Sequence, residues 1–295
     1  MKKQRYGRHC EDEGRSNLSF LAAEESNQIF TGNTDADSSQ NQQLAHRATK
    51  DCFAALAMTT VSLSCFSNSL LHHFTALPLH SITPVSQTAL LGLWQLTEPL
   101  PALWELLPAQ PHYLAYYPDG RDETRARQWL AGRVLAHQLL QEVNDAPAML
   151  RNDPNGRPYF PELPGLGVSL SHSGQWVAAL LDPRGAVGTD IELIRAKAQK
   201  LASRFLSETE RADAGDDAAK YSLYWSAKET LYKLHSRRGL VFKEQLLLDP
   251  FGLREAGVLT GHLLLEKSRS QHQIFYQRLP QDYVLTYALG EIVNL

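Results

Sequence analysis

The chain has 295 residues, of which 43% are hydrophobic and 21% are charged, as is ordinary for a folded globular protein. Its formal net charge of -3 provides no overall basic field, which argues against a dedicated nucleic-acid-binding protein. The cysteines, Cys10, Cys52 and Cys65, lie in the first quarter of the chain without the spacing of a zinc site, so we expect reduced thiols and a cytoplasmic location.

The first part of the chain differs in composition from the rest. Residues 1–50 are rich in Asn, Gln, Ser and charged residues, and they show no sustained hydrophobic period. Between Cys52 and Thr97 there is no charged residue, but Ser, Thr, His, Gln and Pro interrupt the segment too often for a bilayer span. We therefore expect residues 1–85 to be a largely disordered N-terminal extension, and we expect no membrane segment.

From residue 90 onward the pattern becomes that of a globular domain. A buried strand is predicted at 90–96, and a long helix is predicted at 122–143, where apolar residues recur at core spacing. A turn-rich segment at 151–158 precedes the later elements. These are strands at 168–173, 176–181 and 186–191, helices at 196–213 and 216–235, and strands near 257–266, 272–278 and 283–289. Hairpin-like strands with separate helices indicate an α+β fold.

Three carboxylates and one lysine are candidates for a metal-dependent site. Asp190 and Glu192 lie two residues apart on a predicted strand and share one face, while Glu229 and Lys233 lie four apart on a predicted helix. Taken alone, each pair is ordinary: an acidic strand end is usually solvated, and Glu followed by Lys at i+4 is a common surface ion pair. The helix is largely apolar, however, so a partly buried carboxylate there could serve as a metal ligand or a tuned base.

Polar residues elsewhere are suited to phosphate binding. Ser171 and His172 follow a strand pattern without a nucleophile elbow, so they suit phosphate binding as well as they suit catalysis, and a hydrogen-bonded structural histidine is the plain alternative. Arg157 lies on a rigid turn, and Arg125 lies at the start of the first long helix. Guanidinium groups can bind phosphate through two parallel hydrogen bonds, which favours these two arginines.

Four ordered motifs resemble one known family. Residues 188–192 match Gly-x-Asp-x-Glu, and residues 225–233 match Trp-Ser/Ala-x-Lys-Glu-x-x-x-Lys. Residues 156–158 and 170–174 agree with the family's Gly-Lys-Pro turn and its Ile-Ser-His-Ser segment. Over residues 88 to 290 the chain therefore resembles the 4′-phosphopantetheinyl transferases of the monomeric, surfactin-synthetase-activating type.

The resemblance implies an α+β fold of two similar α/β halves in a pseudo-twofold arrangement, which we place at residues 86–165 and 166–295. It implies transfer of the 4′-phosphopantetheine arm of coenzyme A to a serine of an apo acyl or peptidyl carrier protein, with release of adenosine 3′,5′-bisphosphate. Mg²⁺, or Mn²⁺, would be the cofactor. The carrier would belong to a fatty-acid, polyketide, polyunsaturated-fatty-acid or nonribosomal-peptide synthase. The resemblance further implies a cytoplasmic monomer with no nucleic-acid or membrane partner.

The resemblance also implies roles for individual residues. Asp190, Glu192 and Glu229 would bind the metal ion, and Glu229 would take the serine proton. Lys233 would neutralise or protonate the leaving phosphate. The residues expected to bind coenzyme A are Arg125, Arg157, Ser171, His172, Lys228 and Lys233.

Two departures from the family pattern are present. Arg157 replaces the more familiar Lys, and residues 236–240 lack the first glycine of the family's Gly-x-Gly-Leu loop. We hypothesise that Arg237 and Arg238 instead meet the acidic recognition helix of a carrier protein.

Two other functions are open on sequence grounds. One is a catalytically silent protein that binds a carrier or coenzyme A, although all the acid and base candidates are retained. The other is a metal-dependent phosphohydrolase or nuclease. Such enzymes commonly place Glu-x-Lys on a strand, whereas Glu229 and Lys233 are spaced for a helix.

Overall fold

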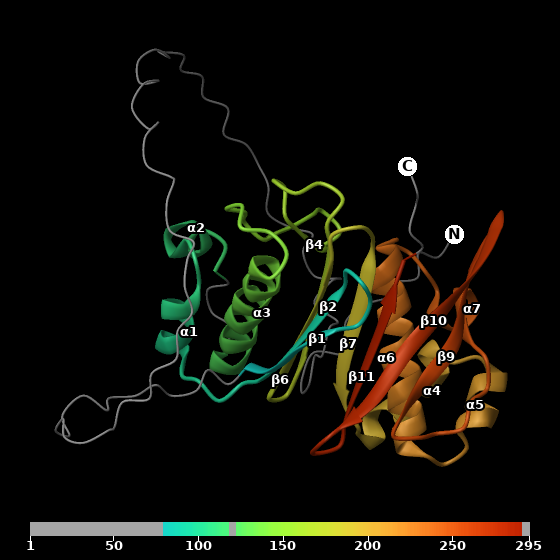
Figure 1. Ribbon diagram of the computed structural model, residues 1–295. Helices are drawn as coiled ribbons and strands as arrows, with labels where there is room; N and C mark the ends of the chain where they lie inside the picture. Colours follow the sequence, from blue (N-terminus) through green and yellow to red (C-terminus); the bar gives the residue numbers. More distant parts are fainter. Residues whose placement is uncertain (1–78, 118–121, 291–295) are drawn as a thin grey trace, which may run out of the picture. The chain divides into compact units, whose positions relative to one another are not determined.

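Two antiparallel sheets, each covered by a long helix on its outer face, form the centre of the structure (Figure 1). The structure is a computed structural model that describes residues 79–117 and 122–290. Mixed helices and sheets confirm the α+β class predicted from the sequence. Apart from the strand at Leu79–Pro84, the N-terminal extension predicted for residues 1–85 lies outside the described residues.

The first sheet has the strand order β1-β2-β6-β5. Its strands are β1 (Leu79–Pro84), β2 (Leu90–Gln95), β5 (Gly167–Ser173) and β6 (Trp176–Asp182). The helices of this half are α1 (Leu100–Leu106), α2 (Gln110–Leu114) and α3 (Glu123–Gln141), and a small two-stranded sheet is formed by β3 (Arg151–Asn152) and β4 (Pro158–Tyr159).

The second sheet has the order β7-β11-β10-β9-β8. Its strands are β7 (Val187–Leu193), β8 (Leu246–Leu248), β9 (Ala256–Leu265), β10 (Ser268–Leu279) and β11 (Tyr283–Leu289). The helices are α4 (Ala196–Phe205), α5 (Glu208–Ala214), α6 (Ala218–His235) and α7 (Phe242–Gln245). The late strands confirm the three strand predictions after residue 256.

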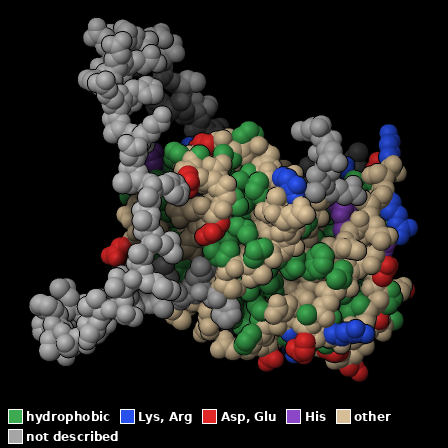
Figure 2. All heavy atoms as spheres, in the orientation of Figure 1, with side chains coloured by type: hydrophobic (Ala, Val, Ile, Leu, Met, Phe, Trp, Pro, Cys, Tyr) green, Lys and Arg blue, Asp and Glu red, His purple; other side chains and the backbone are tan. Residues whose placement is uncertain are grey.

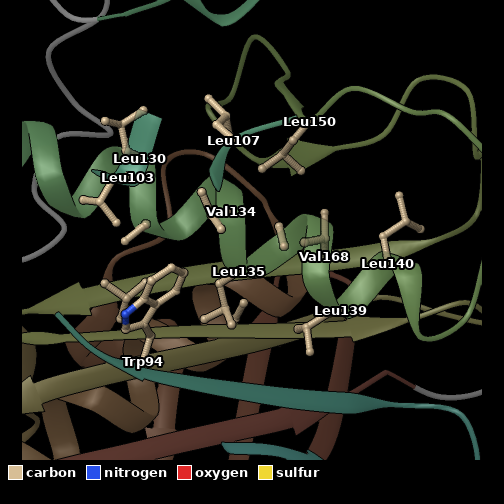
Figure 3. Close-up of a cluster of buried hydrophobic side chains, with 14 of the residues drawn as sticks. Trp94, Leu103, Leu107, Leu130, Val134, Leu135, Leu139, Leu140, Leu150 and Val168 are labelled. Carbon is tan, nitrogen blue, oxygen red and sulfur yellow. The ribbon is translucent and has the colours of Figure 1, made fainter. Parts of the chain in front are cut away.

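Three apolar clusters hold these layers together. One lies between α3 and the first sheet, where Leu135 and Leu139 point from the helix toward the strands and Trp94 (Figure 3). A second lies between α6 and the second sheet, and a third, which includes Trp176 and Ile191, lies between the two sheets. The order of layers is therefore helix, sheet, sheet, helix.

The ends of the two long helices follow from local capping. The side chain of Asp122 accepts a hydrogen bond from the N–H of Arg125 and starts α3. Asp217 caps α6 in the same way, and Ser236 ends it in the left-handed region with φ 50°. The single helix predicted at 196–213 is wrong, because Ser207 and Glu210 form a capping box that starts a new helix.

The border between the two sheets differs from the expected one. We placed it between residues 165 and 166, but β5 and β6 belong to the first sheet, because β6 pairs with β2. The chain passes to the second sheet between Asp182 and Val187.

The surface shows no large region of one charge on the face in view. Figure 2 shows acidic and basic side chains scattered among apolar ones, in keeping with the small net charge of -3. None of the described helices combines the length and the apolarity that a membrane crossing requires.

Candidate active site

The candidate site lies where the edge strands of the two sheets, β5 and β7, run side by side. Three serine hydroxyl oxygens of β5 accept hydrogen bonds from backbone N–H groups of β7 at 3.0 to 3.1 Å. The pairs are Ser169 with Thr189, Ser171 with Ile191, and Ser173 with Leu193. The constant separation of 20 residues shows that the two strands are parallel.

We call the contact between β5 and β7 the joint. Asp190 is fully buried at its centre. The ammonium nitrogen of Lys233 lies 2.8 Å from Oδ1 of Asp190 and 3.0 Å from the carbonyl oxygen of Thr189. The hydroxyl of Ser171 donates to the same Oδ1 at 2.9 Å. The structure therefore brings together Asp190 of β7 and Lys233 of α6, as the sequence predicted.

Glu192 lies two residues further along the same face of β7. Its Oε1 accepts a hydrogen bond from the indole N–H of Trp225 at 3.1 Å, and its Oε2 accepts one from the hydroxyl of Ser173 at 3.3 Å. The ring of Trp225 packs against Phe205 and Phe242, with centroids 4.9 and 5.7 Å away. Both oxygens of this carboxylate are thus held by side chains from different elements.

Glu229 of α6 lies near Asp190 and is only 7% exposed. Burial, and then the negative charge of Asp190, raise the pKa of Glu229 to about 8, while the charge of Lys233 acts in the opposite direction. Asp190 and Glu229 therefore share a largely buried region in which Lys233 is the neighbouring cation that opposes the rise in pKa.

A cavity of about 460 Å³ opens beside this group. Its lining includes Arg125 of α3, His172 of β5, Glu192 of β7 and Trp225 of α6. The structure therefore places two of the predicted coenzyme A-binding residues, Arg125 and His172, around the same hollow as one of the predicted metal ligands.

Arg157 lines a separate, smaller pocket of about 30 Å³, together with Lys233 and Ser169. Along β5, the large cavity includes His172 and Ser173, whereas the small pocket includes Ser169. Arg125 and Arg157 are thus placed around different hollows at the two ends of the same strand.

Lys228, which was also predicted to bind coenzyme A, lies elsewhere. Its side chain is completely buried, and its ammonium group donates to Glu210 at 2.7 Å and to the carbonyl oxygens of Phe205 and Phe242 at 2.8 and 3.2 Å. These three bonds use the three protons of the ammonium group. Lys228 therefore joins α6 to α4, α5 and α7 and has no proton left for a phosphate in this structure.

Sequence reasoning missed several residues around the cavity. Arg195 and Lys197, which line it at the start of α4, were not singled out, and Ser173 belongs to the motif at residues 170–174 but was assigned no role in the site. Ser173 could have been found, since it lies two residues after Ser171 and therefore shares a face of the strand. Trp225 belongs to a recognised motif, but its bond to Glu192 depends on how α6 packs on β7.

Two family models match the chain in succession. The 4′-phosphopantetheinyl transferase N-terminal domain matches residues 122–182, and the 4′-phosphopantetheinyl transferase superfamily matches residues 186–288, so that together they span more than half of the chain. This chain belongs to the 4′-phosphopantetheinyl transferases. The border between the two models falls where the chain passes from β6 to β7, and it agrees with the border between the two sheets.

Curated relatives agree with this family assignment. The chain is 30% identical over 152 residues to the 4′-phosphopantetheinyl transferase Sfp of Bacillus subtilis. The aligned region covers 46% of this chain and 65% of the relative. It is 38% identical over 117 residues to the 4′-phosphopantetheinyl transferase AcpT of Escherichia coli, and this region covers 37% of the chain and 57% of the relative. A third relative, a 4′-phosphopantetheinyl transferase of Bacillus subtilis, is 32% identical over 132 residues, which cover 43% of this chain and 55% of the relative. The chain thus spans between half and two thirds of the length of these relatives, and it is of the Sfp type.

The family resemblance implies a divalent metal ion, so the donor set needs to suit one. Among residues 79–117 and 122–290, no three His, Cys, Asp or Glu side chains are arranged to hold an ion. Mg²⁺, however, commonly uses one or two protein carboxylates together with waters and substrate phosphates. Asp190 and Glu192 supply such oxygens from one face of β7, and Glu229 is buried near Asp190, so that burial and then the charge of Asp190 raise its pKa. The chemistry of these residues therefore fits Mg²⁺ or Mn²⁺.

Proposed function

We propose that this protein transfers the 4′-phosphopantetheine arm of coenzyme A to a serine of an apo acyl or peptidyl carrier protein and releases adenosine 3′,5′-bisphosphate. The observation that carries the proposal is that Asp190, Glu229 and Lys233 lie together at the joint between the two sheets, next to a cavity of about 460 Å³ that is lined by Glu192. Membership of the 4′-phosphopantetheinyl transferases supports it.

Asp190 and Glu192, with Glu229, would hold Mg²⁺ or Mn²⁺. When bound, the ion supplies positive charge against the pyrophosphate, which lowers the energy of a transition state with more negative charge. The remaining chemistry belongs to the side chains and the two substrates.

Glu229 accepts the proton of the carrier serine, directly or through a water molecule, because a serine hydroxyl is a weak nucleophile without a base. The serine oxygen forms a bond to the phosphorus of the phosphopantetheine phosphate, and the bond from that phosphorus to the oxygen of adenosine 3′,5′-bisphosphate breaks. The ammonium group of Lys233 stabilises the negative charge on the leaving phosphate.

Arg125 and His172 are proposed to bind the adenosine bisphosphate part of coenzyme A, since both line the large cavity. Arg157, which lines the small pocket with Lys233, is proposed to bind a phosphate at the other end of the joint. The protein is proposed to act as a cytoplasmic monomer on a carrier of a fatty-acid, polyketide, polyunsaturated-fatty-acid or nonribosomal-peptide synthase.

The test is the intact mass of a panel of apo carrier proteins after incubation with the protein, coenzyme A and Mg²⁺. We expect one carrier class to gain a single phosphopantetheine arm, and we expect a chelator to abolish the gain. The Glu229→Gln variant, assayed in parallel, controls for contaminating transferase. Unchanged masses across the panel, with coenzyme A still bound, would point to a silent binding protein.

A further inference from the structure

The joint between β5 and β7 is made by side chains instead of backbone carbonyl groups. In an ordinary parallel pair of strands, the N–H groups that face the neighbouring strand, on every second residue, donate to its backbone carbonyl groups. Here the N–H groups of β7 donate to the hydroxyls of Ser169, Ser171 and Ser173 at 3.0 to 3.1 Å. All three serines are buried, so these bonds are formed away from water.

A hydroxyl differs from a carbonyl group in one respect that matters here. A carbonyl oxygen can only accept, whereas a hydroxyl that accepts an N–H still has its own proton to donate. Ser171 donates this proton to Oδ1 of Asp190 at 2.9 Å, and Ser173 donates to Oε2 of Glu192 at 3.3 Å. Two hydroxyls of the joint are therefore also bonded to the two carboxylates of β7.

The same local pattern occurs twice. Ser171 accepts the N–H of Ile191, the residue directly after Asp190, and Ser173 accepts the N–H of Leu193, the residue directly after Glu192. Each serine thus contacts both the backbone and the side chain of a two-residue unit of β7. This arrangement fixes the position of the strand and the orientation of the carboxylate together.

Ser169 is the natural comparison within the same joint. It accepts the N–H of Thr189 at 3.0 Å, so it contributes to the joint as the other two serines do. The residue of β7 that precedes Thr189 is Gly188, which has no side chain to hold. Ser169 therefore accepts an N–H of β7 as the other two serines do, but the residue at the position of the carboxylate is a glycine, so there is no carboxylate for Ser169 to bind.

We propose that Ser171 and Ser173 are positioning residues that orient Asp190 and Glu192 for a divalent cation, so that the joint between the halves also sets the geometry of the site. This proposal rests on the proposed function. It gives Ser171 a different role from the direct binding of coenzyme A that the family resemblance implies.

The two carboxylates depend on their serines to different degrees. On Glu192, Ser173 holds one oxygen and Trp225 holds the other, so loss of Ser173 removes the hydrogen bond that orients Oε2. On Asp190, Ser171 and Lys233 bind the same oxygen, so Lys233 still anchors it after loss of Ser171. We therefore expect the larger effect from Ser173.

The experiment measures binding of Mn²⁺ by electron paramagnetic resonance, with coenzyme A present, to the full-length protein and to three alanine variants. For Ser173→Ala we expect Mn²⁺ affinity to fall by about tenfold or more, as is typical when a group that orients a metal ligand is removed. For Ser171→Ala we expect a smaller loss. Ser169→Ala removes a matched N–H bond and should leave Mn²⁺ affinity near that of the wild type.

Three further measurements separate the possible outcomes. Thermal unfolding should show destabilisation in all three variants, and more in Ser171→Ala and Ser173→Ala, which also lose a hydrogen bond to a carboxylate. Coenzyme A binding measured with a chelator should be unchanged in Ser171→Ala; a loss there would show that Ser171 binds coenzyme A directly. Ser173→Thr, which keeps the hydroxyl, should restore Mn²⁺ affinity at least in part.

Two negative results have different meanings. If the wild type binds Mn²⁺ but all three alanine variants bind it equally well, the serines serve the joint alone and the positioning role is overturned. If the wild type binds no Mn²⁺ with coenzyme A present and modifies no carrier protein, the proposed function itself fails.

Discussion

The two halves of the protein use the same architecture for different purposes. Each packs a long helix on an antiparallel sheet, and each helix buries polar side chains. In α3, Gln128 donates to the carbonyl oxygen of Gly174, and Nε2 of His137 lies 2.7 Å from the hydroxyl of Tyr113. These are bonds between neutral partners that fix structure.

The buried charges of the two helices differ: α3 buries Arg133, which donates to the carbonyl oxygen of Trp129 and to Asn152, whereas α6 buries Lys228 and Glu229 near other charged groups. Lys228 pairs with Glu210 inside the protein, and Glu229 lies near Asp190 with a raised pKa. The comparison suggests that the first half contributes residues that line the cavity, whereas the second half contributes most of the charged side chains proposed to take part in the reaction. Changes in equivalent positions of the two halves should therefore have different consequences.

The largest expected effect comes from removing the negative charge of Glu229. The Glu229→Gln variant should lose about 10²- to 10⁴-fold in turnover, because the group proposed to take the serine proton is gone. Its thermal stability should be unchanged or higher, since a neutral amide avoids the cost of a buried carboxylate. Carrier-modification rates and thermal unfolding measure the two quantities. Turnover at the wild-type level with saturating Mg²⁺ would contradict the assignment.

The next largest effect should be on stability, through Lys228. The Lys228→Met variant leaves Glu210 buried without its cation, so the free energy of unfolding should fall by about 3 to 5 kcal/mol. Urea unfolding measures this loss. The matched control is Lys243→Met, because Lys243 is exposed and lies 4.0 Å from Glu244, and its loss should cost less than about 1 kcal/mol. If the free energy of unfolding falls equally in the two variants, the buried ion pair stabilises the protein no more than the exposed one does.

A smaller effect is expected when the pH is lowered, because a buried histidine of the first half, His137, makes the free energy of unfolding depend on pH. Burial, and then the positive charge of Arg133, lower the pKa of His137 to about 4 from the ordinary value of 6.5, while Glu162 acts in the opposite direction. As the pH falls below 6.5, the unfolded chain binds a proton that the folded chain resists until about pH 4. The free energy of unfolding should therefore decrease over this range, by at most about 3 kcal/mol from this group.

The measurement for His137 is urea unfolding at several pH values, with His137→Gln as the comparison. The variant should lose part of the decrease between pH 6.5 and 4. A residual decrease is expected, because burial and His272 also lower the pKa of His235 in the second half. An identical pH dependence in both proteins would exclude His137 as a source.

The smallest expected effects compare two glycines that face the two long helices. A Cβ atom added at Gly188 would lie 2.2 Å from the carbonyl oxygen of Thr230, part of the backbone of α6. One added at Gly92 would lie 2.8 Å from the end of the Leu135 side chain, which can move. We expect Gly188→Ala to cost about 1 to 3 kcal/mol and to lower turnover, and Gly92→Ala to cost less. Urea unfolding and carrier assays of both variants test this order.

Much of the fold could be predicted because its elements are long and strongly patterned. The helices at α3 and α6 and the strands from β9 to β11 lie close to their predicted ranges. The border between the halves could not be predicted, because the pairing of β6 with β2 joins residues far apart in the sequence. The break between α4 and α5 was marked by Ser207 and Glu210, which have the spacing of a capping box.

The candidate site shows the same division between local and non-local information. Periods of two on a strand and four on a helix placed Asp190 and Glu192 on one face and Glu229 and Lys233 on another, and in the structure Asp190 lies near both residues of the helix. The same reasoning could have excluded Lys228, because neighbouring residues on a helix point about 100° apart. The hydrogen bonds of Ser171 and Ser173 could not be found in this way, since they depend on the contact between two separate sheets.

The joint between β5 and β7 also protects the protein from association. Both are the last strands of their sheets, and an unpaired strand edge is a template for pairing with another chain. By lying side by side, the two strands cover one edge of each sheet, with hydroxyl groups occupying the N–H groups of β7. Separation of the halves would expose two sheet edges at once, so a protein with a broken joint should be recovered as aggregates.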